Sequence, residues 1–471
     1  MGSTFFGLNT ALTGLTAQQR ALNTVTHNLT NASTDGFSRQ RVTMAAAPAF
    51  AYPALNLERG PGQIGTGVEV TAYTRVRDQF LDVQYRMQNS SLGTWSATND
   101  ATDRINTLMN EPGDSGLSSL MQRFWSSWQA LSQSPESASA REGVRSTAQS
   151  LVSGFHDLST QLETVRSDSD ALLSGQVTRV NELAAQVNQL NQEIAKAVGV
   201  GQAPNDVLDE RDRLLDELSG LANVAVTPGT NGKVFVSLGG AMLVDATSNT
   251  TNAMAVSATP AVVTVGGTDV TAGLTDGSIK GLIDLRDTIV GGPSGYIATL
   301  DNLAAAVVTR VNAQHQAGFG LDGVGGRDFF QGTTAANIDI SAAVAGSLSA
   351  IAASDTAANV PGGAANAVAV AALQRVAFPI GTDTATLDGY FQGLVSRIGV
   401  DADRAQRMWQ VHQGVTDATA NRREGVFGVN LDEEVADMVR FQKSYNAAAR
   451  MVTAVDEMLD LIVNRLGTVG R

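Results

Sequence analysis

Both ends of the chain carry apolar residues at alternating steps of three and four, the spacing of an amphipathic helix with a coiled-coil seam. The N-terminal seam consists of Phe5, Leu8, Leu12, Leu15, Leu22 and Leu29, interrupted by Gln19 and Thr26. The C-terminal seam consists of Leu431, Val435, Met438, Tyr445, Ala449, Val452, Leu459, Val463 and Leu466, interrupted by Gln442 and Asp456. Such helices must bury these faces on each other, on the body of the protein or on other molecules.

Length, charge and cysteine content narrow the class of protein. A chain of 471 residues exceeds one hydrophobic core and predicts roughly two to four domains. The formal charge of −14 argues against nucleic acid and anionic lipid as main partners. The chain has no cysteine and no run near the roughly 20 apolar residues of a membrane span. No cleavable signal peptide is recognisable at the N-terminus, so we expect neither membrane insertion nor a cleaved leader.

The segment between the ends changes its pattern twice. Residues 136–203 contain no proline and carry sustained apolar seams, which predict a long, coiled-coil-like helix. Residues 222–285 contain three short runs rich in valine, separated by Pro228-Gly, Asn231-Gly and Gly266-Gly, which are hairpin signals. We therefore expect a mostly α-helical, elongated multi-domain rod with a small antiparallel β domain inserted, an α+β fold.

The same patterns predict a division into four parts. A chain that builds a helical rod, inserts a β unit and returns places its two termini at the same end of the molecule. The expected parts are a terminal helical assembly domain with a β-rich connector (1–75 with 429–471), a helical rod domain (76–220, 294–317 and 364–428), an inserted antiparallel β domain (221–293) and a small irregular or β outer segment (318–363).

Catalytic chemistry has little support in the sequence. The glycines of Gly318-Phe-Gly320-Leu-Asp-Gly323 follow a predicted helix instead of linking a strand to a helix, so helix capping is favoured over phosphate binding. The four histidines have no metal-ligand spacing, and we expect solvated or helix-face positions for them. The acidic run of residues 206–217 alternates with Arg211 and Arg213, which favours a solvated, salt-bridged helix face over a catalytic carboxylate pair. We predict no catalytic residue, no metal site and no cofactor.

Local signals mark where the terminal helices stop and start. Asn31 and the following residues favour a turn after the first helix, with Gly36 at positive φ. Asn28, Asn31, Gly36 and Phe37 would shape this turn and anchor it. Asn430 is placed to cap the last helix, with Glu433 three residues later as in a capping box.

Five segments together resemble a known family. Thr26-His-Asn28-Leu-Thr-Asn31-Ala-Ser-Thr-Asp-Gly36-Phe37-Ser-Arg39 and Gly428-Val-Asn430-Leu-Asp432-Glu-Glu434 resemble the N- and C-terminal signatures of flagellar rod, hook and hook-associated proteins. The internal segments 205–215, 281–287 and 311–318, the last continuing to Phe329-Phe330, resemble those of the first hook-associated proteins, which stand at the hook–filament junction. The resemblance spans most of the chain and weakens around Val262 and Ala343.

This resemblance implies a non-enzymatic adaptor of the bacterial flagellum, located outside the cell. It implies export through the flagellar type III apparatus, assembly between the hook protein and the second junction protein, and an export chaperone that covers the C-terminal helix. The two terminal seams, with Asn28, Asn31, Gly36, Phe37 and Asn430, would then form the assembly interface. Mobile ends in the monomer and self-association into a ring or helical tube are further expectations.

Other classes stay open at the level of sequence. A distal rod or hook protein shares the two terminal signatures but not the three internal segments. A secreted adhesin or phage-tail component could also be acidic, free of cysteine and rod-like, although nothing would require matched signatures at its ends. A wall-degrading enzyme would need a catalytic pair that the sequence does not show.

Overall fold

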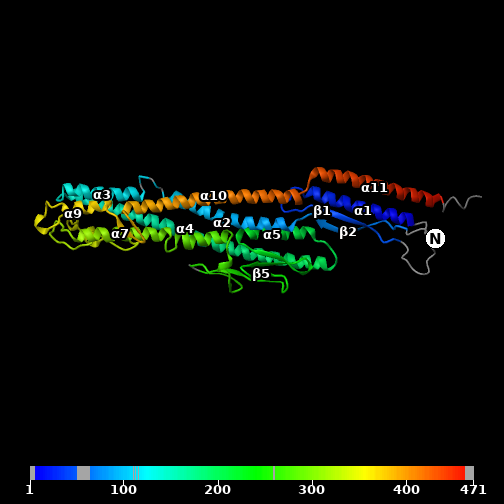
Figure 1. The fold of residues 1–471 in the computed structure, drawn as a ribbon, viewed down its shortest axis with the longest axis horizontal. Helices are drawn as coiled ribbons and strands as arrows, with labels where there is room; N and C mark the ends of the chain where they lie inside the picture. The colour runs from blue at the N-terminus through cyan, green and yellow to red at the C-terminus, as the bar shows by residue number, and fades with distance from the viewer. Residues whose placement is uncertain are drawn as a thin grey trace, which may run out of the picture.

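The computed structural model describes residues 6–49, 64–109, 111, 113–114, 116–257 and 260–461. The described chain forms an elongated rod in which long helices run side by side along the axis (Figure 1). The helices are α1 (Phe6–Thr30), α2 (Gln79–Met109), α3 (Leu117–Gln133), α4 (Ala138–Gly199), α5 (Asn205–Leu221), α6 (Ser278–Asp284), α7 (Tyr296–Gln316), α8 (Ala342–Gly346), α9 (Ala365–Ala372), α10 (Leu387–Phe427) and α11 (Leu431–Asp460). The rod-like, mostly helical fold expected from the sequence is confirmed.

The strands are short and pair only with antiparallel neighbours among the described residues. They are β1 (Gln40–Ala46), β2 (Val68–Arg75), β3 (Ala225–Pro228), β4 (Val234–Leu238), β5 (Ala241–Asp245), β6 (Thr250–Thr251), β7 (Met254–Val256), β8 (Val263–Val265), β9 (Thr268–Asp269), β10 (Phe330–Gln331), β11 (Asp339–Ile340), β12 (Phe378–Ile380) and β13 (Asp383–Ala385).

Helix α4 is the backbone of the rod. It runs for 62 residues without a break, about 93 Å at 1.5 Å per residue. Ser137 caps its start by accepting a hydrogen bond from the backbone N–H of Ala140. Its apolar residues recur at helical spacing and reach two separate cores, one near each half of the helix. The sequence prediction of one continuous helix across this segment is therefore confirmed.

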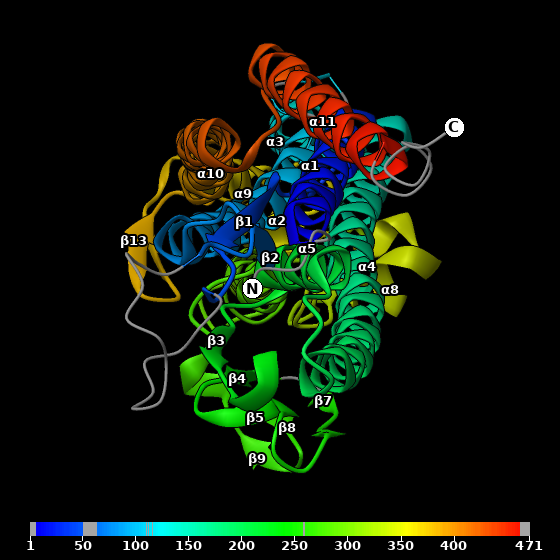
Figure 2. The same cartoon turned by 90° about the vertical axis from the view of Figure 1, so that its right-hand side faces the viewer.

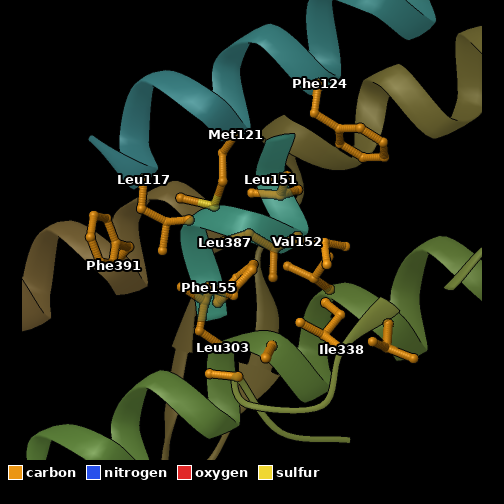
Figure 3. Packing of buried hydrophobic residues seen from close by; sticks show 14 of the residues in the cluster. Leu117, Met121, Phe124, Leu151, Val152, Phe155, Leu303, Ile338, Leu387 and Phe391 are labelled. Atoms are coloured by element: carbon orange, nitrogen blue, oxygen red, sulfur yellow. The ribbon is translucent and has the colours of Figure 1, made fainter. Parts of the chain in front are cut away.

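The distal core joins α3, α7, α9 and α10 to the first half of α4. Figure 3 shows Met121, Phe155 and Leu303, which come from three of these helices, packed together with Ile338. Residues 318–363, expected as a small outer segment, contribute Phe329, Phe330 and several aliphatic side chains to this same core. In its packing this segment is part of the distal end of the rod.

The inserted strands lie along the second half of α4 and on α5 and α6. They form a four-stranded sheet in the order β3-β4-β5-β6 and a three-stranded sheet in the order β7-β8-β9. Gly266 and Gly267 both have positive φ in the turn between β8 and β9, as a two-residue type I′ hairpin requires. The antiparallel β insertion expected from the hairpin signals is confirmed.

One expected helical stretch is interrupted. The predicted helical rod domain includes residues 364–428, but α9 ends at Ala372 and the β12–β13 hairpin precedes α10. Pro379 cannot donate a helical hydrogen bond, and Gly381 takes a positive φ of 59° at the hairpin turn. These two residues explain why the chain turns here.

Both terminal helices lie at the end of the rod opposite the distal core (Figure 1). In Figure 2, α11 lies beside α1, with the β1–β2 hairpin close to both. The end of α1 meets the start of α11, since Asn28 is bonded to Glu434, so the two helices are antiparallel. The expectation that the two chain ends meet is confirmed for the described residues.

Candidate assembly surface

The N-terminal helix buries small residues more deeply than its leucines. Leu8, Leu15, Leu22 and Leu29 are half-buried, whereas Leu12 is 51% exposed. The buried positions of α1 are Ala11, Ala17, Ala21, Thr24, Val25 and Asn28. Small side chains let helices and strands approach closely, and the leucine seam flanks this contact. Sequence reasoning missed the alanines because heptad spacing draws attention to large apolar residues. Phe5 lies outside the described residues.

The C-terminal helix is largely exposed on its outer side. Met438, Tyr445, Val452 and Leu459 are half-buried. Leu431 and Val435 are instead 54% and 49% exposed, so these two predicted seam residues are not covered within the single chain. Other exposed apolar residues of the helix are Val439, Met451, Met458 and Leu461. Val463 and Leu466 lie outside the described residues.

A buried polar cluster, which we call the clasp, joins the two chain ends through Asn28, Arg39 and Glu434. Glu434 is 1% exposed, although it stands in the first turn of α11. Its carboxylate accepts hydrogen bonds from Asn28 Nδ2 at 3.0 Å and from Arg39 Nε at 2.6 Å. Asn28 also exchanges two hydrogen bonds with the backbone of Gln40. The clasp thus ties α1, β1 and α11 together at one point.

The predicted N-cap is present, but the reciprocal half of the capping box is not. The side-chain oxygen of Asn430 accepts hydrogen bonds from the backbone N–H groups of Asp432 and Glu433. The Glu433 carboxylate is paired with Arg39 Nη1 at 2.6 Å instead of capping the helix. Burial lowers the pKa of Arg39, but the hydrogen bond to Glu433 and the charge of Glu434 raise it more, so the net shift is upward.

The turn after α1 has the predicted conformation. Gly36 has a φ of +77°, and Asn31 donates a side-chain hydrogen bond to the carbonyl of His27. Phe37 packs edge-on against the His27 ring at 5.3 Å. His27 in turn contacts Asp206 at 3.2 Å. The end of α1 therefore contacts α5 through His27, and Phe37 from the turn packs against the same ring.

Next to the clasp, four arginines and four aspartates form a second polar cluster, which we call the hub. Its members are Arg75, Arg77, Arg86 and Arg423 with Asp82, Asp209, Asp212 and Asp216. Each of these side chains is at most 18% exposed. They come from β2, α2, α5, α10 and, for Arg77, the link between β2 and α2, so the hub fastens the terminal part of the chain to the rod.

Asp212 is the centre of the hub. It contacts Arg75 at 3.0 Å and both Arg77 and Arg86 at 3.4 Å. Burial raises the pKa of Asp212, but the positive charges of Arg77 and Arg75 lower it by more. The net shift is downward, so the carboxyl stays ionised. The pKa of Arg77 is raised, because the Asp82 hydrogen bond and the charge of Asp212 outweigh the effect of burial.

The hub corrects the sequence interpretation of residues 206–217. The solvated, salt-bridged face that we expected is present at the pair Glu210–Arg213 and at Asp206 and Glu217, which pair with His27 and Arg179. Asp209, Asp212 and Arg211 are buried. The alternating charges looked like a surface helix because their partners on β2 and α2 lie more than 100 residues away in the sequence.

Two other sequence candidates have structural roles. Gly318 donates a backbone hydrogen bond to the carbonyl of His315 just after α7, as helix capping predicts. Of the two positions expected for the histidines, solvated or on a helix face, His315 takes the second, since it is fully buried on α7. Its Nδ1 bonds the carbonyl of Arg327, and its Nε2 accepts from the N–H of Ala352. Within the described ranges, no three histidine or acidic residues are grouped as a metal site would require.

Comparisons with known proteins agree with this arrangement. Residues 102–330 match the family model described as the flagellar hook-associated protein FlgK helical domain. Residues 8–37 match the flagella basal body rod protein family, and residues 427–466 match the C-terminal family of flagellar basal body rod FlgEFG proteins. The chain is also 34% identical to flagellar hook-associated protein 1 of Bacillus subtilis (strain 168), over the full length of both chains.

This chain belongs to the flagellar hook-associated protein 1 family. It is also 32% identical to flagellar hook-associated protein 1 of Salmonella typhimurium (strain LT2), over 69% of this chain and 59% of that protein. The fold resembles that of the flagellar hook junction protein FlgK from Burkholderia pseudomallei, with a TM-score of 0.64 and 17% identity. That likeness covers 73% of this chain and all of the solved one.

Membership of the hook-associated protein 1 family makes this chain a structural component of the flagellum, associated with its other axial parts. The two rod-protein matches fall on α1 with its turn and on α11. These are the two segments that the clasp joins. In the part of the chain that the structure describes, no helix is long and apolar enough to cross a membrane.

Proposed function

We propose that this protein joins the flagellar hook to the filament through the second junction protein. In this proposal the chain self-assembles through α1 and α11 into a ring or helical tube. The clasp is the observation that carries it, because it shows that the two rod-protein segments form one unit at one end of the rod. A single unit at a rod end is a natural place for contacts between subunits.

The exposed apolar residues of α11 support an assembly role. Leu431, Val435 and Val439 are each more than 40% exposed and follow one another at steps of four residues, on a helix that already has another face against α1. Contiguous apolar surface on an isolated chain marks an interaction site. Each such side chain contributes about 1.5–3 kcal/mol when it becomes fully buried. The contacts would be heterologous, since one surface must meet a different one for a tube to grow.

The same apolar helix would be a hazard before assembly. We propose that an export chaperone covers α11 in the cytoplasm and that the chain leaves through the flagellar type III apparatus. Deleting the residues after Asn430 should abolish binding of this chaperone. Binding that survives the deletion would remove this part of the proposal.

Deletion of the gene in its own host tests the proposal directly. We expect electron microscopy to show hooks without filaments, with filament protein lost to the medium. Reintroducing the wild-type gene should restore filaments. Normal filaments in the deletion strain would overturn the junction role.

Point variants then test the assembly surface. Val435→Asp together with Val439→Asp places two charges on the exposed face of α11, and we expect export without incorporation. Val400→Asp is the matched control, because Val400 is 63% exposed on α10, outside the two terminal helices. Equal motility of both variants would contradict an assembly role for the exposed face of α11.

A further inference from the structure

We propose that the clasp makes docking of the N-terminal segment conditional on the C-terminal helix, so that only a chain with its C-terminal helix in place presents the complete assembly surface. This inference rests on the proposed function, because it concerns the control of the same surface. The interaction behind it is the pairing of the buried Arg39 with the carboxylates of Glu433 and Glu434, at the start of α11.

Arg39 depends on α11 for its charge balance. Among the described residues, both carboxylates paired with Arg39, those of Glu433 and Glu434, stand in the first turn of α11. The Arg39 side chain is only 9% exposed. A buried charge without its partner is strongly destabilising. Without α11, Arg39, the residue directly before β1, would have to turn to water, which would pull the start of the strand away from its packed position.

Helix α1 also depends on α11, through Asn28. Its amide nitrogen donates both to Glu434 and to the carbonyl of Gln40, and its oxygen accepts from the N–H of Gln40. Asn28 is itself 1% exposed. Glu434 therefore supports α1 through Asn28 and β1 through Arg39. Loss of this one carboxylate weakens both elements together.

The partners in the clasp lie near opposite ends of the chain, so the clasp can close only when nearly the whole chain is present. Asn28 and Arg39 precede Glu434 by 406 and 395 positions. A chain that emerges with its N-terminus first must wait for nearly its entire length before the clasp can close. An incompletely delivered chain would lack the partner and could not occupy a position in the assembly.

The hub shows that this dependence is local. Three of its four aspartates are on α5, and those that pair with Arg75 lie only 134 and 137 positions away. None of the eight hub residues stands on α11, so the hub keeps all of these partners when α11 is absent. The rod can fold and hold the β1–β2 end in reach, while closure of the terminal pair waits for Glu434.

The test uses full-length variants expressed in the deletion strain. Glu434→Gln keeps the size of the side chain and removes its charge. Glu433→Gln is the matched control, because Glu433 pairs with the same Arg39 but its side chain is 58% exposed. Immuno-electron microscopy and assay of the medium measure the fractions of the chain that are incorporated at hook tips and lost. We expect Glu434→Gln to be exported and its incorporation to fall at least tenfold, with less than a threefold effect for Glu433→Gln.

A double variant separates the clasp from general damage to the fold. Arg39→Gln with Glu434→Gln leaves no unpaired buried charge, so we expect it to recover incorporation several-fold over Glu434→Gln alone. Hydrogen exchange in α3 and α4 should be unchanged in all three proteins. Wild-type incorporation of Glu434→Gln, or a double variant no better than the single one, would overturn the inference. Because the wild-type gene restores filaments in the same strain, that result would leave the proposed function standing.

Discussion

Different interactions stabilise the two ends of the rod. At the distal end, the fully buried rings of Phe124, Trp128, Phe329 and Phe330 pack with centroids 4.8–6.3 Å apart. At the other end, the clasp joins the two terminal helices to each other through buried charges and an amide, and the hub joins the end of β2 to the rod through buried charges. The burial of apolar surface in the distal core is a strong but non-directional force. Charge pairs require defined partners, so they fix the position of the end where assembly is proposed.

This difference suits the proposed roles of the two ends. Replacement of a buried ion pair by apolar residues often stabilises a protein, so such pairs are weak evidence for stability alone. Fixing the register of a packed element is their best-attested use. We interpret the hub as the feature that sets the direction in which α1 and α11 leave the rod. The predictions below test this contrast.

The largest expected effect comes from the distal core. Phe329 is fully buried and contacts the rings of Phe124, Trp128, His315 and Phe330. Phe329→Ala should lower the free energy of unfolding by about 3–5 kcal/mol, because it leaves a cavity in a packed core. Chemical denaturation measures this loss. Phe80→Ala, at a side chain that is 70% exposed, is the control and should change little.

Breaking the hub should cost somewhat less. Asp212→Asn removes a charge that three arginines share, and we expect a loss of about 2–4 kcal/mol. The loss falls at the lower side of the range for buried pairs because Asp209 still faces Arg75 and Arg77. Glu210→Gln, in the exposed pair with Arg213, should cost under about 1 kcal/mol. Equal losses in the two variants, by denaturation, would mean that the hub behaves as a surface feature.

Acid should weaken the aromatic end through His315. Burial lowers the pKa of His315 to about 4, below the ordinary value of about 6.5. The unfolded chain therefore binds the proton more readily, and the stability that neutral His315 provides is lost as the pH falls from about 6.5 to about 4. The loss should reach about 3 kcal/mol. Denaturation curves across this range measure it, and His315→Asn should flatten the dependence; an unchanged slope in that variant would assign the effect elsewhere.

The smallest effect should come from the cap of α11. Asn430→Ala removes the acceptor for two backbone N–H groups, and such a change costs about 1 kcal/mol. Hydrogen exchange of the first turn of α11 should rise while the distal core stays protected. Asn430→Ser restores a capping oxygen and should recover most of the loss. Failure of Ser to do so would show that Asn430 acts through something other than capping.

The sequence predicted the features that depend on interactions between residues close together in the chain. The long helix α4, the hairpin at Gly266-Gly267, the positive φ of Gly36 and the cap at Asn430 all follow from residues within a few positions of each other. Propensity and hydrogen bonding act over that distance, so a single sequence reveals them. The meeting of the chain ends followed from the order of the predicted elements.

Contacts between distant segments were beyond this reasoning. Periodicity identified the leucines of α1 but not the alanines that it buries, and it treated Asp209 and Asp212 as solvated. It placed Asn28 and Glu434 in two separate signatures without linking them. A helix pattern states which residues share a face. It does not state which face another segment will cover, or which distant residue will pair with a charged side chain on that face.

The sequence by itself therefore determined the elements, the antiparallel β insertion and the family, because local forces and motif residues carry that information. Only the tertiary structure decided that Glu434 is buried between Asn28 and Arg39, that four arginines and four aspartates fasten the terminal part to the rod, and that Leu431 and Val435 are exposed. The physical reason is that burial depends on which distant surface arrives, and a buried charge is stable only where its partner does.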